Sequence, residues 1–245
     1  MRNLTIAEHF SSIQGEGKSA GTKAVFLRLA GCNLSCGGPQ TMSRGKLGNG
    51  ATWRCDTIEV WIKGVPYSAD ELYSLFLATG YISELQAGAH LVITGGEPLL
   101  QQDQLADFLK MFRREVFIEV ETNATFLPDA EFSPLIAQFN VSPKLANSGM
   151  DRTLRINQPA LTWFAKDTRA IFKFVVTRLQ DWQEIEQDFA DPFGIPRHRI
   201  WLMPGAETRA ALHEIQPLVA ELCLTRQVNF SPRLQLEIWD RRTGI

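Results

Sequence analysis

Short apolar runs alternate along this chain with amphipathic stretches, and this alternation restricts the possible folds more than any single residue does. The apolar runs predict buried strands at residues 24–30, 91–94, 116–121, 171–176 and 200–203. Strands that alternate with helices favour a mainly parallel sheet with helices outside it. In such folds the functional site lies on loops at the carboxyl ends of the strands.

The stretches between the strands carry helix signals. A capping-box pattern at 68–71 opens the first predicted helix. Apolar residues at helical spacing predict further helices at 105–112 and 182–189. We expect another helix at 207–224, kinked or restarted at Pro217, because proline removes a backbone donor from a helix interior.

Length and charge limit the class of protein. The 245 residues are enough for one α/β domain or a small pair of domains. A net charge of −2 gives no overall basic field, so we expect no nucleic-acid partner. The first residues lack a secretory apolar region, and no apolar run approaches the roughly 20 residues of a membrane span. We therefore expect a cytoplasmic protein with no membrane partner.

Three of the four cysteines lie early in the chain. Cys32 and Cys36 are separated by three residues, and Cys55 follows after another eighteen. In a reducing compartment, clustered cysteines more often bind metal or react than form disulfides. Three thiolates can hold three irons of a cubane iron–sulfur cluster and leave one iron open, although this spacing alone also allows a zinc site or unrelated thiols. Cys223 has apolar neighbours at helical spacing and is predicted to lie in the core.

Further segments occur in an order that resembles one enzyme family. These segments are Phe-Ser-Ser-Ile-Gln-Gly-Glu-Gly at 10–17, Phe-Leu-Arg-Leu-Ala-Gly-Cys-Asn-Leu at 26–34, Thr-Gly-Gly-Glu-Pro-Leu-Leu at 94–100, Glu-Thr-Asn at 121–123, Ser-Pro-Lys at 142–144 and Ile-Trp-Asp-Arg-Arg-Thr-Gly-Ile at 238–245. With Cys-Asp-Thr at 55–57, they resemble the 7-carboxy-7-deazaguanine synthase family of radical S-adenosylmethionine (SAM) enzymes. The resemblance implies an α/β fold, a partial, open (β/α) barrel with a reduced helix complement. It implies one radical SAM domain over 1–245.

The cluster loop departs from the pattern of that superfamily. Radical SAM enzymes usually carry two residues between the second and third cysteine, whereas here residues 37–54 form an insertion that holds five glycines. Lengthening the loop from two residues to eighteen costs about 2 kcal/mol, which is small beside roughly 10 kcal/mol for a structural metal site. The insertion is therefore compatible with cluster binding. It is expected to cover the cluster, contact a reductant, line the substrate pocket or be a plain surface excursion.

The resemblance implies two cofactors at the cysteines. Cys32, Cys36 and Cys55 would hold a [4Fe-4S] cluster whose open iron is chelated by SAM, and reductive cleavage of SAM would give a 5′-deoxyadenosyl radical. The residues expected at SAM are Arg54, Asp56, Gly96, Glu97, Ser142, Pro143 and Lys144. Glu97 is expected to accept a hydrogen bond from the SAM ammonium group. Residues 203–206 resemble the adenosine-binding turn, with glycine in place of a glutamate.

The resemblance also implies the substrate, 6-carboxy-5,6,7,8-tetrahydropterin. Its conversion to 7-carboxy-7-deazaguanine with loss of ammonia would serve 7-deazapurine biosynthesis of the preQ0 or queuosine type. The residues expected to bind it are Ile13, Gln14, Gly15, Glu16, Arg28, Thr94, Gln235 and Ile245. Arg28 can hold the substrate carboxylate through two parallel hydrogen bonds, unless it forms an ion pair within the chain.

The remaining family features concern the chain end and a second metal. Gln235 stands where the family often has a histidine, just before a final strand that contains Trp239, and glutamine cannot titrate. Ile245 would present its terminal carboxylate toward the substrate. Thr57 matches the family's Mg²⁺ ligand, and Mg²⁺ suits a hydroxyl oxygen together with waters.

Three functions are therefore in competition. The first is the synthase, expected to be a homodimer that takes electrons from a reductant such as flavodoxin or ferredoxin. The second is an activase that generates a glycyl radical on a protein partner. The third is a noncatalytic metal-binding homologue that lost the open-iron cluster. The substrate-turn motif at 10–17 and the terminal motif at 238–245 favour the synthase, because an activase has no reason to carry them.

Overall fold

One mixed sheet organises the chain in the computed structural model, which describes residues 3–38, 41, 46–112, 116–242 and 244. The strands of this described part are β1 Leu4–Ile13, β2 Lys23–Leu29, β3 Val65–Tyr67, β4 His90–Gly95, β5 Ile118–Thr122, β6 Gln138–Val141, β7 Ala170–Val176, β8 Ile200–Pro204 and β9 Asn229–Phe230. They follow the order β3-β1-β2-β4-β5-β6-β7-β8-β9. The sheet therefore ends at β3 and β9, and it is open.

Most of the sheet is parallel. β2 and β4 to β9 run in one direction, while β1 is antiparallel to both β2 and β3. In the β2–β4 pair, Arg28 lies opposite Thr94 and Leu29 opposite Gly95, so both strands end at the same edge. The loops after the parallel strands converge at that edge. The predicted open, partial (β/α) barrel is confirmed.

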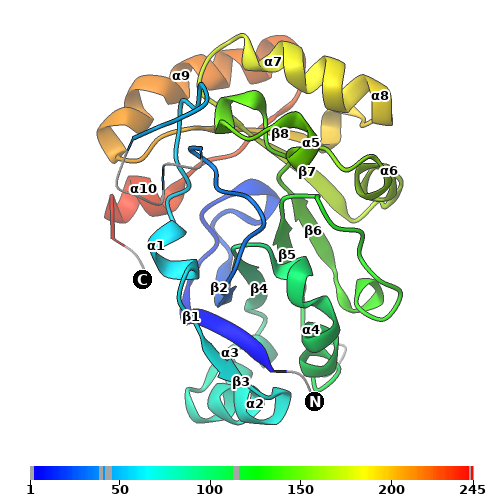
Figure 1. Cartoon of the computed structure of the whole chain (residues 1–245). Helices are drawn as coiled ribbons and strands as arrows, with labels where there is room; N and C mark the ends of the chain where they lie inside the picture. The colour runs from blue at the N-terminus through cyan, green and yellow to red at the C-terminus, as the bar shows by residue number, and fades with distance from the viewer. Residues whose placement is uncertain (1–2, 39–40, 42–45, 113–115, 243, 245) are drawn as a thin grey trace.

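The helices lie outside the sheet. They are α1 Ile58–Trp61, α2 Ala69–Ala78, α3 Tyr81–Gln86, α4 Gln102–Leu109, α5 Arg152–Arg155, α6 Gln158–Lys166, α7 Asp181–Glu184, α8 Asp191–Phe193, α9 Arg209–Arg226 and α10 Leu234–Trp239. Short 3-10 turns are η1 Gly17–Ser19, η3 Pro98–Gln101, η4 Ser133–Leu135, η5 Ala146–Ser148 and η7 Arg197–Arg199. Figure 1 shows α2 and α3 at one end of the molecule and α7, α8 and α9 at the other.

The local signals for helices are largely confirmed. Ser68 accepts a hydrogen bond from the Glu71 amide, and the Glu71 carboxylate accepts one from the Ser68 amide at 2.8 Å, which completes the predicted capping box of α2. The predicted helix at 182–189 corresponds to α7, a π-helical turn over Ile185–Ala190, and α8. α9 continues through Pro217, so the predicted restart is not observed there.

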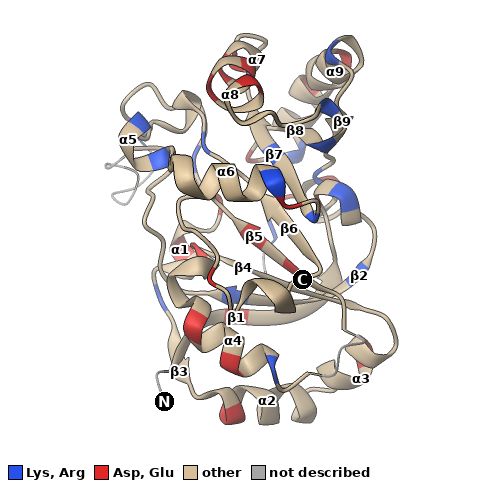
Figure 2. Ribbon diagram, turned by 90° about the vertical axis from the view of Figure 1, so that its right-hand side faces the viewer, with Lys and Arg blue, Asp and Glu red and all other residues tan. Residues whose placement is uncertain are grey.

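The two faces of the sheet differ in polarity because successive strand residues point to opposite sides. The outer face and the helices form one large apolar core, which includes Phe76, Phe108 and Phe164 from the helices and Cys223 from α9. Cys223 thus has the core position that the sequence predicted. Figure 2 shows that charged residues are frequent on the helices, whereas the strands are mainly neutral.

The inner face of the sheet carries the exceptions. Its apolar residues include a small cluster around Phe26 and, on β7, Ile171 and Val175, and several of its other buried positions are polar or charged. On β4, β5, β6 and β7 these positions include Thr94, Glu119, Asn140 and Lys173, each less than 6 % exposed. Buried polar groups need partners. We therefore expect a binding site on the inner face of the sheet, where a ligand can supply such partners.

Four of the strands in the described part of the chain lack a clear apolar run in the sequence. β1, β3, β6 and β9 were not predicted, because their residues mix polar and apolar types and two of these strands are edges of the sheet. The predicted final strand around Trp239 is wrong, since Trp239 is the last residue of α10. Residues 234–239 form the helix α10 instead. Its first residue contacts the turn after β1, where the Leu234 amide donates to the Gly15 carbonyl at 3.0 Å. Among the described residues, none of the helices is both long and apolar enough to cross a membrane.

Candidate functional site

A cavity of about 530 Å³ opens at the edge where the parallel strands end. Its wall is built from the turn after β1, the ends of β2 and β4 to β8, the cysteine loop and the segment that leads into α10. This volume is typical of small-molecule sites. Segments that are far apart in sequence therefore share one concave surface, at the place that the fold class predicts.

The three early cysteines line this cavity. All three are free thiols, and the Cys55 amide donates to the Cys36 carbonyl at 3.2 Å, which brings the third cysteine back beside the second. Burial raises the pKa of Cys32 to about 11 and that of Cys36 to about 12. Among the described residues, no group of three His, Cys, Asp or Glu side chains is arranged to hold a single metal ion. A cubane cluster instead places each thiolate on a different iron.

Short contacts close the described part of the insertion between the second and third cysteines. The Gly48 amide donates to the Gly37 carbonyl at 2.8 Å, so the two ends of the loop run side by side before Cys55. The Trp53 indole N–H donates to the Asn147 side-chain oxygen at 2.8 Å, and the Thr52 amide donates to the Asn147 carbonyl at 2.9 Å. These bonds tie the returning half of the insertion to the segment after β6.

That segment carries the Ser-Pro-Lys motif. Ser142 and Lys144 both line the cavity, and the Lys144 ammonium donates to the Ser142 hydroxyl at 3.0 Å. The same ammonium lies 5.9 Å from the centre of the Trp53 ring, within reach of a cation–π attraction. Pro143, the middle residue of the motif, is buried. The insertion and the motif thus form one wall of the cavity.

The Gly-Gly-Glu turn after β4 abuts the start of the cysteine loop. A Cβ atom on Gly96 would overlap the Gly31 carbonyl and lie 2.8 Å from the Cys32 amide nitrogen, closer than real Cβ atoms come. The Glu97 amide donates to that same Gly31 carbonyl at 2.9 Å. Glycine is therefore required by close approach of two segments of this chain.

Glu97 has a different environment from the one expected. Its side chain is fully buried, and its carboxylate accepts hydrogen bonds from the Leu99 amide at 3.0 Å, the Thr122 hydroxyl at 2.8 Å and the Asn123 amide at 2.7 Å. Burial raises the pKa of Glu97. The carboxylate thus joins the turn after β4 to the end of β5. The contact with a SAM ammonium group stays a prediction, and Glu97 supports the cavity wall from behind.

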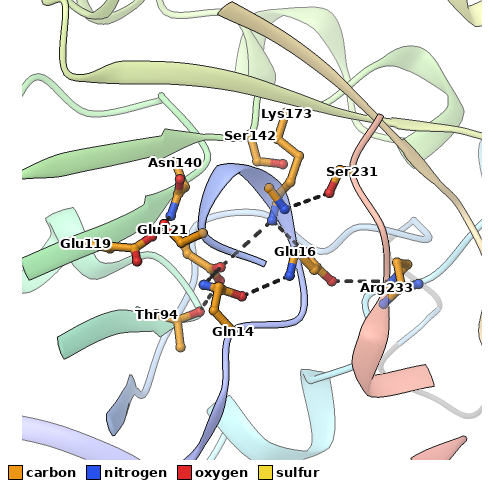
Figure 3. Close-up of polar contacts among 12 residues, drawn as sticks. Gln14, Glu16, Thr94, Glu119, Glu121, Asn140, Ser142, Lys173, Ser231 and Arg233 are labelled. Carbon is orange, nitrogen blue, oxygen red and sulfur yellow. Dashed lines mark hydrogen bonds and ion pairs between the residues drawn. The ribbon is translucent and has the colours of Figure 1, made fainter. Parts of the chain in front are cut away.

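Glu16 is the most heavily paired acid of the cavity. Its carboxylate accepts from the Lys173 ammonium at 2.5 Å, and Arg233 approaches it at 3.4 Å (Figure 3). It also accepts from the Gln235 amide at 2.6 Å. Burial by itself raises the pKa of Glu16, but Lys173 and Arg233 outweigh it and lower the pKa to about 2. Arg233 also pairs with Asp56 at 2.6 Å.

A second acid, Glu121, lies near the same lysine. Glu121 accepts from the Thr94 hydroxyl at 2.7 Å and from the Gln14 amide at 3.4 Å, and its other neighbour is the Lys173 ammonium at 3.9 Å. The Gln14 side-chain oxygen in turn accepts from the Glu16 amide at 3.1 Å. In Figure 3 these side chains, from β4, β5, β7 and the turn after β1, point toward one another. The arrangement offers carboxylate acceptors fixed by the chain.

Two buried polar atoms of cavity residues have no partner in the described part of the chain. They are the Arg54 Nε and the Gln235 Oε1, two of the four such atoms there. An unsatisfied buried group normally costs about 1–3 kcal/mol, and such groups concentrate where a ligand completes the hydrogen bonding. The three thiols and these open positions fit a cluster with a polar ligand beside it.

Comparison with known proteins decides the family. The model of a 4Fe-4S single cluster domain matches residues 13–141. A 7-carboxy-7-deazaguanine synthase of Pyrobaculum aerophilum is 32% identical over 98% of this chain and 97% of its own length. One of Hyperthermus butylicus is 33% identical over 95% of this chain and 92% of its own. The chain belongs to the 7-carboxy-7-deazaguanine synthase family. Its predicted class, a radical SAM lyase with a [4Fe-4S] cluster and SAM as cofactors, is confirmed.

The fold of this family member agrees with a solved structure. The crystal structure of QueE from Escherichia coli superposes with a TM-score of 0.62 at 24% identity, over 94% of this chain and 93% of that chain. This match supports the fold, while the roles of individual side chains depend on the contacts described above.

The structure brings together most of the residues that the sequence nominated. The predicted residues that line the cavity are Ile13, Gln14, Gly15, Glu16, Arg28, Cys32, Cys36, Arg54, Cys55, Asp56, Thr57, Thr94, Gly96, Ser142, Lys144 and Gln235. Glu97 and Pro143 are not part of that lining. Ile245 lies outside the described residues. Arg28 forms an ion pair with Glu8 at 2.7 Å, the alternative considered from sequence, although both side chains remain at the cavity.

Sequence reasoning missed the two cations that hold Glu16. Lys173 lies within an apolar run that predicts a buried strand, and Arg233 lies in a segment where the family resemblance points only to Gln235. A lysine at an inner position of a buried strand is itself a signal, because such a charge needs a buried partner. Glu121 was noted as part of a motif, but its role at the cavity was not recognised.

Proposed function

We propose that this chain converts 6-carboxy-5,6,7,8-tetrahydropterin to 7-carboxy-7-deazaguanine with loss of ammonia, in 7-deazapurine biosynthesis of the preQ0 or queuosine type. The observation that carries the proposal is the convergence, in one cavity, of three free thiols and two acids fixed by buried cations. The thiols suit a cluster, and the fixed acids suit a heterocycle rich in N–H groups. Both requirements of the reaction are met at one strand edge.

Cys32, Cys36 and Cys55 would hold the [4Fe-4S] cluster, and SAM would lie beside it against Gly96, Ser142 and Lys144. When bound, these two cofactors supply the hydrogen-atom abstraction that starts the reaction. The chain's own part is to hold and orient the reactants and to exclude water. Arg54 and Asp56, which flank Cys55, are further candidates for contact with SAM. The buried Nε of Arg54 has no hydrogen-bond partner among the described residues, so it could donate to SAM.

The substrate would lie between the turn after β1 and the inner face of the sheet. Glu16 and Glu121 provide acceptors for ring N–H groups, and the Thr94 hydroxyl holds one oxygen of Glu121 in place. Arg28 donates to Glu8 through Nε, so its outer guanidinium nitrogens remain available to a substrate carboxylate. Gln235 has a buried oxygen without a partner in the described part of the chain, which suits a donor on the substrate.

Thr57 is proposed as a Mg²⁺ ligand. Its hydroxyl lies 3.5 Å from the Cys55 sulfur and lines the cavity. A hydroxyl beside a substrate oxygen and several waters meets the preference of Mg²⁺ for hard oxygen ligands. The metal would hold substrate near the cluster.

Further proposed features concern the domain, the oligomeric state and the electron donor. Residues 1–245 would form one radical SAM domain with residues 37–54 as the inserted loop, since all described strands belong to one sheet. We expect a homodimer, as the resemblance to the family implies. We also expect a cytoplasmic protein that takes electrons from a flavodoxin or ferredoxin, because free thiols and an iron–sulfur cluster need a reducing environment.

The deciding experiment is an anaerobic turnover assay. Reconstituted protein would be incubated with SAM, Mg²⁺, a reductant and 6-carboxy-5,6,7,8-tetrahydropterin, and mass spectrometry would follow 7-carboxy-7-deazaguanine. We expect product that depends on all components except Mg²⁺, which should only raise the rate. A protein with an intact cluster that cleaves SAM but forms no carboxydeazaguanine would refute the proposed function. A protein that binds no cluster would point to the noncatalytic homologue.

A further inference from the structure

A lysine stands at the centre of the cavity floor, where an apolar strand would be expected to carry none. Lys173 is the middle residue of β7, and its side chain is 6% exposed. The neighbouring residues Phe172 and Phe174 point to the apolar core, so Lys173 points to the inner face. Burial of an ammonium group is costly unless it is paired. Its position therefore depends on what faces it.

The charged groups that face Lys173 come from three other parts of the chain. Glu16, from the turn after β1, lies at 2.5 Å, and Glu121, from β5, lies at 3.9 Å. Arg233, which precedes α10, approaches Glu16 at 3.4 Å from the other side and pairs with Asp56 at 2.6 Å. Three carboxylates thus share two cations. Lys173 is the cation that both Glu16 and Glu121 contact (Figure 3).

The two acids are not equally occupied. Glu16 accepts from Lys173 and from Gln235 at 2.6 Å. One oxygen of Glu121 accepts from Thr94 at 2.7 Å, but its other oxygen has only long contacts, to Gln14 at 3.4 Å and to Lys173 at 3.9 Å. A carboxylate has about four acceptor positions, so Glu121 has room for donors from a ligand.

We propose that Lys173 is a positioning residue that keeps Glu16 ionised and holds Glu16 and Glu121 in place as acceptors for the amino-pyrimidinone edge of the substrate. This inference rests on the proposed function. That edge presents a ring N–H and an exocyclic amino group side by side, and an ionised carboxylate accepts two such donors in parallel. A protonated carboxyl group would present a donor to a donor.

The physical reason lies in the opposition between burial and charge. Burial disfavours the ionised form of a carboxyl group, and two nearby carboxylates disfavour each other's charge. Lys173 lies between the two acids and offsets both effects. Without Lys173, the remaining cation beside Glu16 is Arg233, which also pairs with Asp56. Glu16 would then take up a proton at a higher pH than in the wild type. Binding of the amino-pyrimidinone edge would then become weaker in acid.

The test uses reconstituted protein without SAM, so that binding is measured and turnover does not occur. The probes are 6-carboxypterin, which is aromatic and stable in air, and 6-carboxylumazine, in which an oxo group replaces the exocyclic amino group. Isothermal titration would be carried out between about pH 5.5 and pH 7, where Glu16 of the wild type is ionised. The variants are Lys173→Met and Lys173→Arg. Lys110→Met is the matched control, because Lys110 pairs with Glu131 on the surface.

We expect the wild type and Lys110→Met to bind the pterin about 10- to 100-fold more tightly than the lumazine at every pH. Lys173→Met should lose most of this discrimination, and its pterin affinity should fall as pH decreases. Lys173→Arg should recover the pH-independence, because it restores the positive charge. A purely structural lysine would alter the melting temperature of the protein and leave both the pH profile and the discrimination unchanged.

Lys173→Met binding that matches the wild type in affinity, pH profile and discrimination would overturn the inference. If Lys173→Met does not fold, the double variant with Glu16→Gln replaces it, because this variant removes one carboxylate together with the cation. Weak binding of the pterin by the double variant is expected, and wild-type affinity there would also overturn the inference. Product formation by the wild type, measured in parallel, tests the proposed function separately.

Discussion

The substitution Gly96→Ala tests how the fold aligns the cysteine loop. Gly96 lies just after β4, and a methyl group there would overlap the Gly31 carbonyl and come within 2.8 Å of the Cys32 amide nitrogen. Real Cβ atoms essentially never approach closer than 3.0 Å. The Gly31 carbonyl and the Cys32 amide belong to the backbone, which cannot rotate away as a long side chain can. One of the two segments must therefore move.

The magnitude follows from that overlap. Overpacking costs about 1–3 kcal/mol, which corresponds to a fall of roughly 2–12 °C in melting temperature for a domain of this size. Relief of the overlap requires a shift of roughly 1 Å, enough to reduce a positioned reaction by about a hundredfold. The shift also stretches the 2.9 Å hydrogen bond from the Glu97 amide to the Gly31 carbonyl. We expect the loss of SAM cleavage to exceed the loss of stability.

Three measurements check this prediction. Thermal unfolding followed by circular dichroism gives the stability, iron content after anaerobic reconstitution gives cluster occupancy, and 5′-deoxyadenosine formation gives SAM cleavage. Gly48→Ala is the matched control, because a Cβ atom on Gly48 would meet nothing within 4 Å. If Gly96→Ala cleaved SAM at the wild-type rate with an unchanged melting temperature, the close approach of the two segments would not matter as argued.

Three further predictions follow from the same contacts. Cys55→Ala should prevent normal iron loading and abolish SAM cleavage, whereas Cys223→Ala, a substitution in the core, should retain the cluster. Trp53→Phe removes the 2.8 Å hydrogen bond to Asn147, worth about 1 kcal/mol, so amides of residues 46–54 should exchange with solvent deuterium about fivefold faster. Lys173 and Arg233 lower the pKa of Glu16 from 4.5 to about 2 against the effect of burial, so this acid stabilises the fold above about pH 4.5 and loses that contribution as pH falls toward about 2. The difference in free energy of unfolding between wild type and Glu16→Gln, measured by urea titration, should therefore shrink between about pH 5 and pH 3.

Each of these predictions has an outcome that contradicts it. Wild-type iron content and SAM cleavage in Cys55→Ala would mean that another group is the third ligand. Unchanged exchange in Trp53→Phe, with α2 as the internal reference, would show that the Asn147 bond does not hold the insertion. A stability difference for Glu16→Gln that stays constant with pH would mean that Glu16 is not held ionised in the fold.

The sequence predicted what depends on neighbours in the chain. Apolar runs located five of the strands, and the Ser68 capping box located the start of α2, because these signals arise within a few residues. The order of the motifs and the cysteine trio predicted the family and its cofactors. Strands such as β1 and β6 escaped prediction because their inner positions carry polar residues, which line the cavity on β1 and bond to Glu119 on β6.

The tertiary structure alone determined how the insertion closes and what Glu97 does. The return of Cys55 to Cys36 depends on Trp53 and Thr52 meeting Asn147, more than ninety positions later. The carboxylate of Glu97 is directed to the end of β5, which a motif cannot reveal, because a motif names a residue and leaves its partners open.

The partners of Lys173 in the cavity also could not be read from the sequence. The sequence shows a lysine within an apolar strand, but Lys173 and Glu16 are 157 positions apart, and Arg233 and Glu16 are 217 apart. The free energy of a buried charge depends on which opposite charges the fold places beside it. Sequence alone therefore determined the fold class and the chemistry of the cluster loop, and only the folded chain determined which acids remain ionised at the site.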